Sequence, residues 1–80
     1  MYTVYVLYSP SYNQVYTGQT QDITARLIRH NAGKVISTKR YRPWNLVYTE
    51  EYATRTEAMK REKFLKSGVG RDFLRSLNLF

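Results

Sequence analysis

YTVYVLYSPSYNQVYTGQT, residues 2–20, is the stretch that predicts how this chain folds. Two runs of β-forming residues, Tyr2–Tyr8 and Gln14–Thr17, flank the turn-rich segment SPSYN, a pattern typical of a β-hairpin. Gly18 follows the second run, and we expect it to end that strand. Because a hairpin alone is barely stable, the rest of the chain must cover it.

The first strand carries apolar side chains on both faces. Its odd-numbered residues, Thr3 to Leu7, share one face, and its even-numbered residues, Tyr2 to Tyr8, share the other. We therefore expect a central strand that is covered on both sides. A four-residue loop at Ser9–Tyr12 would set Tyr5 opposite Tyr16, whereas a five-residue loop would put them on different faces; the sequence leaves both registers open.

A helix is predicted next, over Ile23–Asn31. Asp22 suits its N-cap and Gly33 its stop. Arg26 and His30 are four residues apart, so we expect them to stand together on one helical face.

Residues 34–44, KVISTKRYRPW, combine cations with Tyr41 and Trp44 and show no clear period. Basic residues between aromatic ones suit phosphate contact and base stacking. The alternative is a solvated loop whose Trp44 folds into the core, and the sequence does not choose between the two. The candidate nucleic-acid-binding residues of this loop are Lys34, Lys39, Arg40 and Arg42.

The last part of the chain predicts one strand and two helices. The strand covers Leu46–Tyr52, and a capping-box pattern opens a helix over about Thr54–Lys66. Gly68 and Gly70 are expected to break it before a short helix at Asp72–Leu77. The order β-β-α-β-α-α predicts an α+β fold, a small three-stranded antiparallel sheet flanked by helices.

Side-chain pairs and core positions on these helices follow from their spacing. Glu57 with Arg61, and Glu62 with Lys66, are spaced for i,i+4 ion pairs. The candidate inward-facing residues are Ala58, Met59, Phe64, Leu65, Phe73, Leu74 and Leu77.

Length and composition narrow the class of protein. Eighty residues predict one domain, residues 1–80, with a modest core. The chain has no cysteine, no apolar run that could span a membrane and no signal-peptide pattern, which favours a cytoplasmic protein. The net charge of +7 predicts a polyanionic partner, most often nucleic acid.

Few residues of this sequence are candidates for catalysis or metal binding. One histidine excludes a histidine-rich metal site, and the chain has no phosphate-binding glycine loop. Each remaining candidate has a structural alternative: packing for the tyrosines, a solvated helix face for the arginine and histidine, and a surface ion pair for the glutamate. The candidates are Tyr5, Tyr16, Arg26, His30 and Glu62.

The order of these segments resembles the GIY-YIG endonuclease superfamily, specifically its small stand-alone bacterial group. The first family motif falls on residues 4–6, VYV, which keep the tyrosine and lack the glycine, and the second falls on residues 16–18, YTG. ARLIRHNAGK resembles the next block, and STKRYRPWNLVYTEEY and TRTEAMKREKFLK resemble the later ones. In the last block, Glu62 matches the acidic residue of the family.

The resemblance implies a divalent-metal-dependent endonuclease, a hydrolase of DNA phosphodiester bonds. Glu62 would hold one Mg²⁺ or Mn²⁺, and Arg26 would bind the scissile phosphate. A tyrosine would accept the proton of the attacking water, and Arg26, the metal and His30 would have to lower its pKa from the usual ~10. Tyr5 is favoured as this base, with Tyr16 positioning the water or the phosphate.

Because the chain lacks a separate DNA-targeting domain, the resemblance implies preference for DNA structure rather than sequence, as in repair or recombination. Two alternatives remain: a non-catalytic nucleic-acid-binding domain, and a protein-interaction module whose charge only aids solubility.

Overall fold

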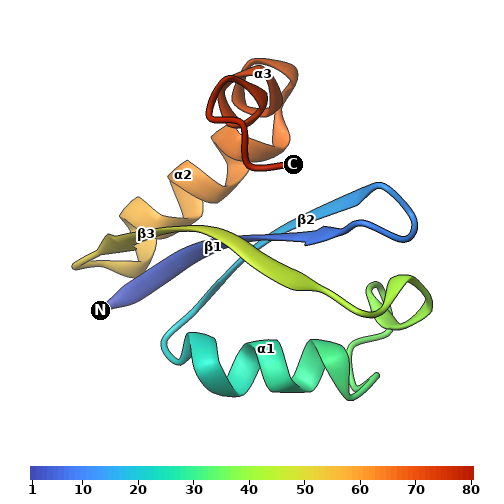
Figure 1. Cartoon of the computed structure of the whole chain (residues 1–80). Coiled ribbons are helices and arrows are strands. Elements are labelled where there is room, and N and C mark those ends of the chain that lie inside the picture. The colour runs from blue at the N-terminus through green and yellow to red at the C-terminus, as the bar shows by residue number, and fades with distance from the viewer.

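The computed structural model describes residues 1–80 and has an antiparallel sheet between helices (Figure 1). The strand order is β2-β1-β3; α1 covers one face, and α2 and α3 cover the other. The predicted α+β fold is therefore confirmed. The elements are β1 (Tyr2–Ser9), β2 (Gln14–Thr20), α1 (Ile23–Asn31), a 3-10 turn (Lys39–Tyr41), β3 (Asn45–Tyr52), α2 (Arg55–Lys66) and α3 (Gly68–Ser76).

The pairing of the two hairpin strands differs from the one expected for a loop at Ser9–Tyr12, which would set Tyr5 opposite Tyr16. The loop has four residues, but they are Pro10–Asn13, because Asn13 adopts the left-handed conformation (φ 51°) that asparagine tolerates in turns. Tyr5 therefore pairs with Gly18, and Tyr16 pairs with Leu7. Both tyrosines still share one face, as diagonal neighbours.

Strand β1 is central and buried on both faces, as its pattern predicts. On one side Val4 and Val6 pack with Ala58, Leu65 and Leu74 of α2 and α3. On the other side Tyr5 and Leu7 pack with Trp44 and, more loosely, with α1. The core is thus two thin apolar layers, one on each face of the sheet.

Two glycine predictions were wrong. Gly18 does not end β2, which continues to Thr20, because the glycine is a paired residue of the ladder. Helix α2 does end at Lys66, as predicted, but Gly68 and Gly70 lie in the first turn of α3, which begins well before Asp72. A Cβ on Gly70 would lie 2.0 Å from the Phe64 carbonyl oxygen, so this glycine serves the close packing of α3 on the end of α2.

The helix faces were also only partly predicted. Ala58, Leu65 and Leu74 are buried as expected, whereas Met59, Phe64 and Leu77 are exposed. The predicted Glu57–Arg61 ion pair was wrong, because Arg61 Nε lies 2.8 Å from a carboxylate oxygen of Glu50 on β3. The Glu62–Lys66 pair is present at 2.7 Å.

Trp44 belongs to the core. Its indole N–H donates to the Thr38 carbonyl, and its backbone is held at both its N–H and its carbonyl by Asn31. Trp44 therefore folds into the core, as one of the two alternatives for this loop predicted. None of the helices has the length and apolar composition of a membrane span.

Candidate active site

Four of the five candidate residues line one pocket of about 420 Å³. Tyr5 and Tyr16 come from the sheet, Arg26 from α1 and Glu62 from α2. The remaining lining residues are Tyr2, Gly18, Gln19, Thr20, Gln21 and Arg55. We call this the β2-edge pocket.

Arg26 and Glu62 meet although their helices cover opposite faces of the sheet. Strand β2 is an edge strand, and α2 packs against it, so side chains from both faces reach the pocket around that edge. Glu62 follows Arg55 by seven residues, two turns along α2, which puts both on the same helical face.

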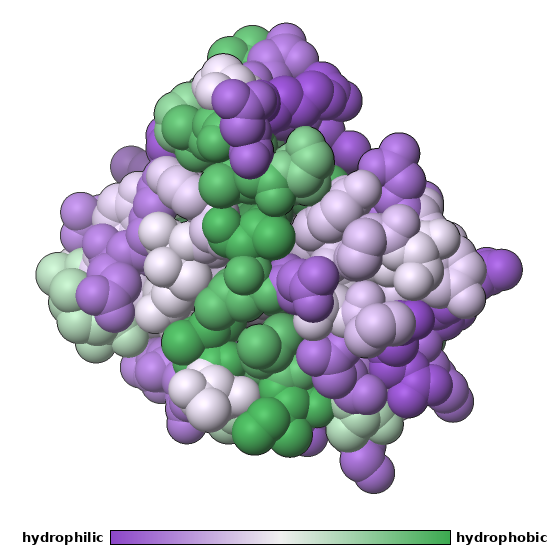
Figure 2. Space-filling view, in the orientation of Figure 1, coloured by the Kyte–Doolittle hydropathy of each residue, from purple (hydrophilic) through white to green (hydrophobic).

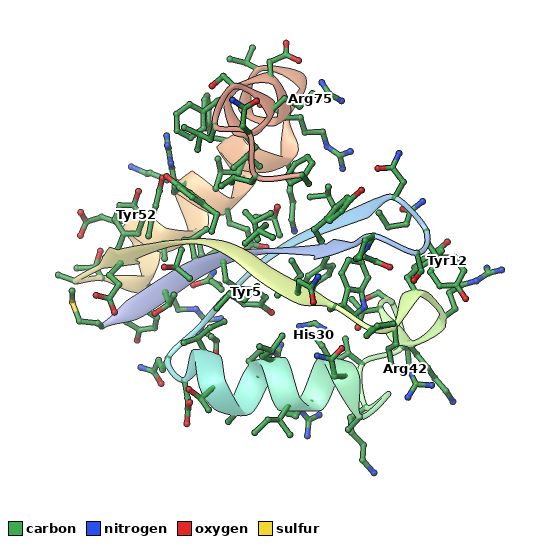
Figure 3. The ribbon with its side chains drawn as sticks, in the orientation of Figure 1. Tyr5, Tyr12, His30, Arg42, Tyr52 and Arg75 are labelled. Atoms are coloured by element: carbon green, nitrogen blue, oxygen red, sulfur yellow. The ribbon has the colours of Figure 1, made fainter.

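His30 lies behind the pocket wall, joined to Tyr5 (Figure 3). The Tyr5 hydroxyl and His30 Nε2 are 2.8 Å apart, and His30 Nδ1 is 2.8 Å from Thr38 Oγ1. Tyr5, His30 and Thr38 are fully buried, and the Tyr16 ring lies 5.0 Å from the imidazole. These three side chains form a continuous polar chain inside the apolar layer under α1.

We assign the direction of this hydrogen-bond chain from the surroundings of Thr38. Its hydroxyl lies 3.4 Å from the Val35 carbonyl, and with its proton directed there its lone pair accepts from His30 Nδ1–H. His30 Nε2 is then the unprotonated nitrogen, and it accepts from the Tyr5 hydroxyl. The arrangement provides a proton acceptor directly behind a tyrosine hydroxyl.

Burial shifts the pKa of both partners toward their neutral forms. The expectation that nearby cations lower the tyrosine pKa was wrong for Tyr5: burial raises its pKa to about 12, although the neighbouring Arg26 guanidinium opposes the shift. Burial also lowers the pKa of His30, and the charges of Arg26 and Arg29 lower it further. At neutral pH the pair is therefore uncharged, which its hydrogen bond requires.

Gly18 makes room for the Tyr5 hydroxyl. A Cβ at this position would lie 2.7 Å from that oxygen and 3.1 Å from the Tyr16 ring. Any side chain larger than hydrogen would displace Tyr5 from His30. The glycine of the YTG motif is therefore a packing requirement of the pocket.

Glu62 is the carboxylate available to a metal ion in the pocket. One oxygen accepts from Lys66 at 2.7 Å, and the other makes no hydrogen bond within the protein. No group of three acidic, histidine or cysteine side chains surrounds it. A single carboxylate fits a hard cation such as Mg²⁺ or Mn²⁺ that takes its other ligands from water and phosphate.

The basic loop forms a separate and larger hollow. Lys39, Arg40 and Arg42 line it with Tyr12 at the hairpin tip, and its volume is about 650 Å³. Lys34 is exposed but is not part of this lining. Arg42 packs over Gly33 and donates to the Lys39 carbonyl at 2.8 Å, so its side chain also holds the loop together.

Two residues of the site escaped sequence reasoning. Arg55 lines the pocket from the first turn of α2, and its seven-residue spacing to Glu62 was a usable signal. Thr38 gave no signal, because a threonine in an aperiodic loop carries no indication that it will meet a buried histidine.

Comparison with known proteins finds a family, relatives and a solved structure to which this chain is similar. The family model described as the GIY-YIG catalytic domain matches residues 1–75. A UPF0213 protein from Staphylococcus epidermidis is 50% identical over 54 residues. The match covers 66% of this chain and 66% of the relative, so the chain spans just under two thirds of that protein. One from Staphylococcus haemolyticus is 46% identical over 56 residues, 69% of this chain and 68% of that one.

A solved structure is also similar. The solution NMR structure of a UPF0213 protein from Bacillus halodurans is 34% identical, with a TM-score of 0.57. The match covers 96% of this chain and 85% of the other.

Proposed function

The chain belongs to the GIY-YIG nuclease family, and from that premise we propose that it is a divalent-metal-dependent endonuclease that hydrolyses DNA phosphodiester bonds. The observation that carries the proposal is the β2-edge pocket, where two tyrosines, an arginine and a glutamate from separate elements converge. The proposal includes recognition of DNA structure over sequence and a role in repair or recombination.

Arg26 is suited to bind the scissile phosphate. Its Nε is buried and has no hydrogen-bond partner within the protein, so it is a donor that a phosphate oxygen would satisfy. A guanidinium also stabilises the negative charge that grows on the phosphoryl oxygens during attack. Arg55 supplies a second positive charge at the same pocket.

Tyr5 and His30 together provide a base. A free Tyr5 phenolate is disfavoured, because its pKa is about 12. A relay avoids that species: Tyr5 oxygen takes a proton from the attacking water while its own proton passes to His30 Nε2. The resulting hydroxide attacks phosphorus, the bond to the leaving 3′-oxygen breaks, and that oxygen takes a proton from solvent water. Tyr16, half-buried beside Tyr5, positions the water or the phosphate.

Glu62 would hold the cation. A Mg²⁺ or Mn²⁺ ion bound there supplies charge stabilisation for the leaving oxygen. Lys66 has to release one carboxylate oxygen or share the group with the ion, and the exposed Lys66 side chain is free to move.

The test is nicking of DNA in Mg²⁺ or Mn²⁺. Tyr5→Phe should lose about 10²–10⁴ in rate while DNA binding persists. Arg26→Ala should lose about 10²–10³, because it removes one preorganised electrostatic partner. Glu62→Gln should abolish the metal response. Tyr8→Phe and Glu51→Gln, outside the pocket, are the matched controls and should cut like the wild type.

A second candidate is a non-catalytic nucleic-acid-binding domain. The complete burial of Tyr5 and the Lys66 bridge to Glu62 favour it, because both groups are engaged within the protein. Wild type that binds DNA yet cuts no duplex, branched or single-stranded DNA and no RNA, with either metal, would establish this alternative. A folded Tyr5→Phe that binds and cuts normally would move the role of base to Tyr16.

A further inference from the structure

A second cation-lined hollow lies on the other side of the hairpin from the basic loop. It has a volume of about 480 Å³ and lies between the hairpin end and α3. Arg71 and Arg75, one turn apart on α3, supply its charge, and Phe80 with the residues 13–15 completes its lining. In Figure 3, Arg75 and Arg42 lie on opposite sides of the hairpin, with Tyr12 at its tip.

The two arginines are available to a ligand. Arg71 is exposed and makes no ion pair or side-chain hydrogen bond. Arg75 pairs with Asp72 at 2.8 Å, but both side chains are more than half exposed, at 65% and 77%. An ion pair that is this exposed contributes little to stability, so an anion can replace it at little cost.

One strand, β2, runs from this hollow to the proposed active site. Strand β2 begins at Gln14, which lines the α3 hollow, and ends at Thr20, which lines the β2-edge pocket. Seven residues of strand span roughly 20 Å, about the reach of a few nucleotides of a nucleic-acid backbone. In Figure 2 the apolar side chains form a band from α3 across β3 to α1, and the hydrophilic ones lie on either side of it.

We propose that Arg71 and Arg75 form a second phosphate-binding site, which holds the nucleic-acid backbone several nucleotides from the bond that is cut. This inference rests on the proposed function, since it assigns a nucleic-acid ligand. The chemistry is contact of two guanidinium groups with phosphodiester oxygens, with no reading of bases. It adds a site beyond the basic loop, on the opposite side of the hairpin.

The test measures binding alone, by fluorescence anisotropy of a labelled DNA duplex without divalent metal, over a series of salt concentrations. The double variant Arg71→Ala with Arg75→Ala should bind more weakly, and its salt slope should fall by about one to two units. The control pair, Lys60→Ala with Lys63→Ala, removes the same charge from exposed positions of α2 that line none of these hollows. Arg71→Lys with Arg75→Lys should keep the slope.

Equal losses in the alanine pair and the control pair would overturn the inference, because net charge alone would then explain the effect. Binding to anionic vesicles that depends on Arg71 and Arg75, with unchanged DNA binding, would overturn it in favour of a membrane surface. Chemical-shift changes at residues 13–15, 71 and 75 of the wild type on DNA titration give a readout that needs no variant, and their absence would also overturn it. If the wild type cuts DNA and the two arginines have no effect on binding, this inference fails and the proposed function stands. If DNA binds through the two arginines but is not cut, the inference stands and only the proposed catalysis fails.

Discussion

At the scale of single residues, the site depends on which ring nitrogen of His30 carries a proton. We assign this proton to Nδ1, because the Thr38 hydroxyl lies 2.8 Å from that nitrogen and is placed to accept from it while directing its own proton to the Val35 carbonyl. Only with the proton on Nδ1 is Nε2 a lone pair facing the Tyr5 hydroxyl. Thr38 touches no substrate group in this scheme, so it is a positioning residue for the proposed relay.

Thr38→Val removes that hydroxyl and keeps the shape of the side chain. A buried Nδ1–H would then lack an acceptor, which costs ~1–3 kcal/mol, so we expect the ring to shift its proton to Nε2. Long-range ¹H–¹⁵N NMR should show the change of tautomer, and cleavage should fall toward the loss caused by Tyr5→Phe. Thr38→Ser should restore both, and an unchanged tautomer in Thr38→Val would contradict the assignment.

The same histidine predicts a pH dependence. The pKa of His30 is lowered below its usual 6.5, chiefly by burial, so the folded protein resists protonation that the unfolded chain accepts. The stability contributed by neutral His30 is complete above about pH 6.5 and is lost as the pH falls from there through the lowered pKa. Cleavage should fall over the same lowered pKa, because a protonated Nε2 cannot accept the Tyr5 proton.

At the scale of elements, the hydrophobic pattern predicted type and order, and glycine positions were the main source of error. Strand β1 followed from its run of β-forming residues, and helix α1 from a cap and a stop; Gly33 does take the left-handed φ of 76° at the end of α1. Gly18 and Gly70 were misread as breaks, because their reason is close packing against Tyr5 and Phe64. Gly18 packs against the neighbouring strand and Gly70 against the end of the preceding helix, and the conformational preference of a glycine does not indicate such contacts.

The junction of β3 and α2 shows the same limit. Glu50 accepts two hydrogen bonds from Arg61, at 2.8 and 3.0 Å, and one each from Tyr48 and Tyr52. Burial alone would raise the pKa of Glu50, but these donors outweigh it and lower the pKa. The helical spacing predicted that Arg61 pairs with Glu57. Arg61 instead pairs with the half-buried carboxylate of Glu50 on β3.

Glu50→Gln should therefore destabilise the protein by about 1–3 kcal/mol at neutral pH, since it weakens charge-assisted hydrogen bonds. The free energy of unfolding, measured with denaturant, tests this. Because the pKa of Glu50 is lowered, the stability that its carboxylate contributes is present above about pH 4.5 and is lost as the pH falls through the lowered pKa. The Glu50→Gln variant should therefore lose less stability on acidification than the wild type. The matched control is its exposed neighbour, Glu51→Gln, which should change stability by less than ~0.5 kcal/mol. Equal effects of the two substitutions would contradict the prediction.

At the scale of the whole molecule, the candidate site could be predicted as a set of residues but not as an arrangement. The family motifs identified Tyr5, Arg26 and Glu62, yet only the edge position of β2 explains how helices on opposite faces present them to one pocket. The net charge of +7 predicted a polyanionic partner, and the structure distributes its cations around the pocket and on both sides of the hairpin.

The basic loop leads to the last prediction. Lys34, Lys39 and Arg40 are exposed, so their joint replacement by alanine should flatten the salt slope of DNA binding by about three units, with little sequence dependence and an unchanged melting temperature. Arg42→Ala should differ, because this side chain packs over Gly33 and donates to the Lys39 carbonyl. We expect it to lower both DNA affinity and the melting temperature. If replacing all four residues leaves affinity and its salt dependence unchanged, DNA does not bind at this loop, and the α3 hollow and the β2-edge pocket must account for all of the binding.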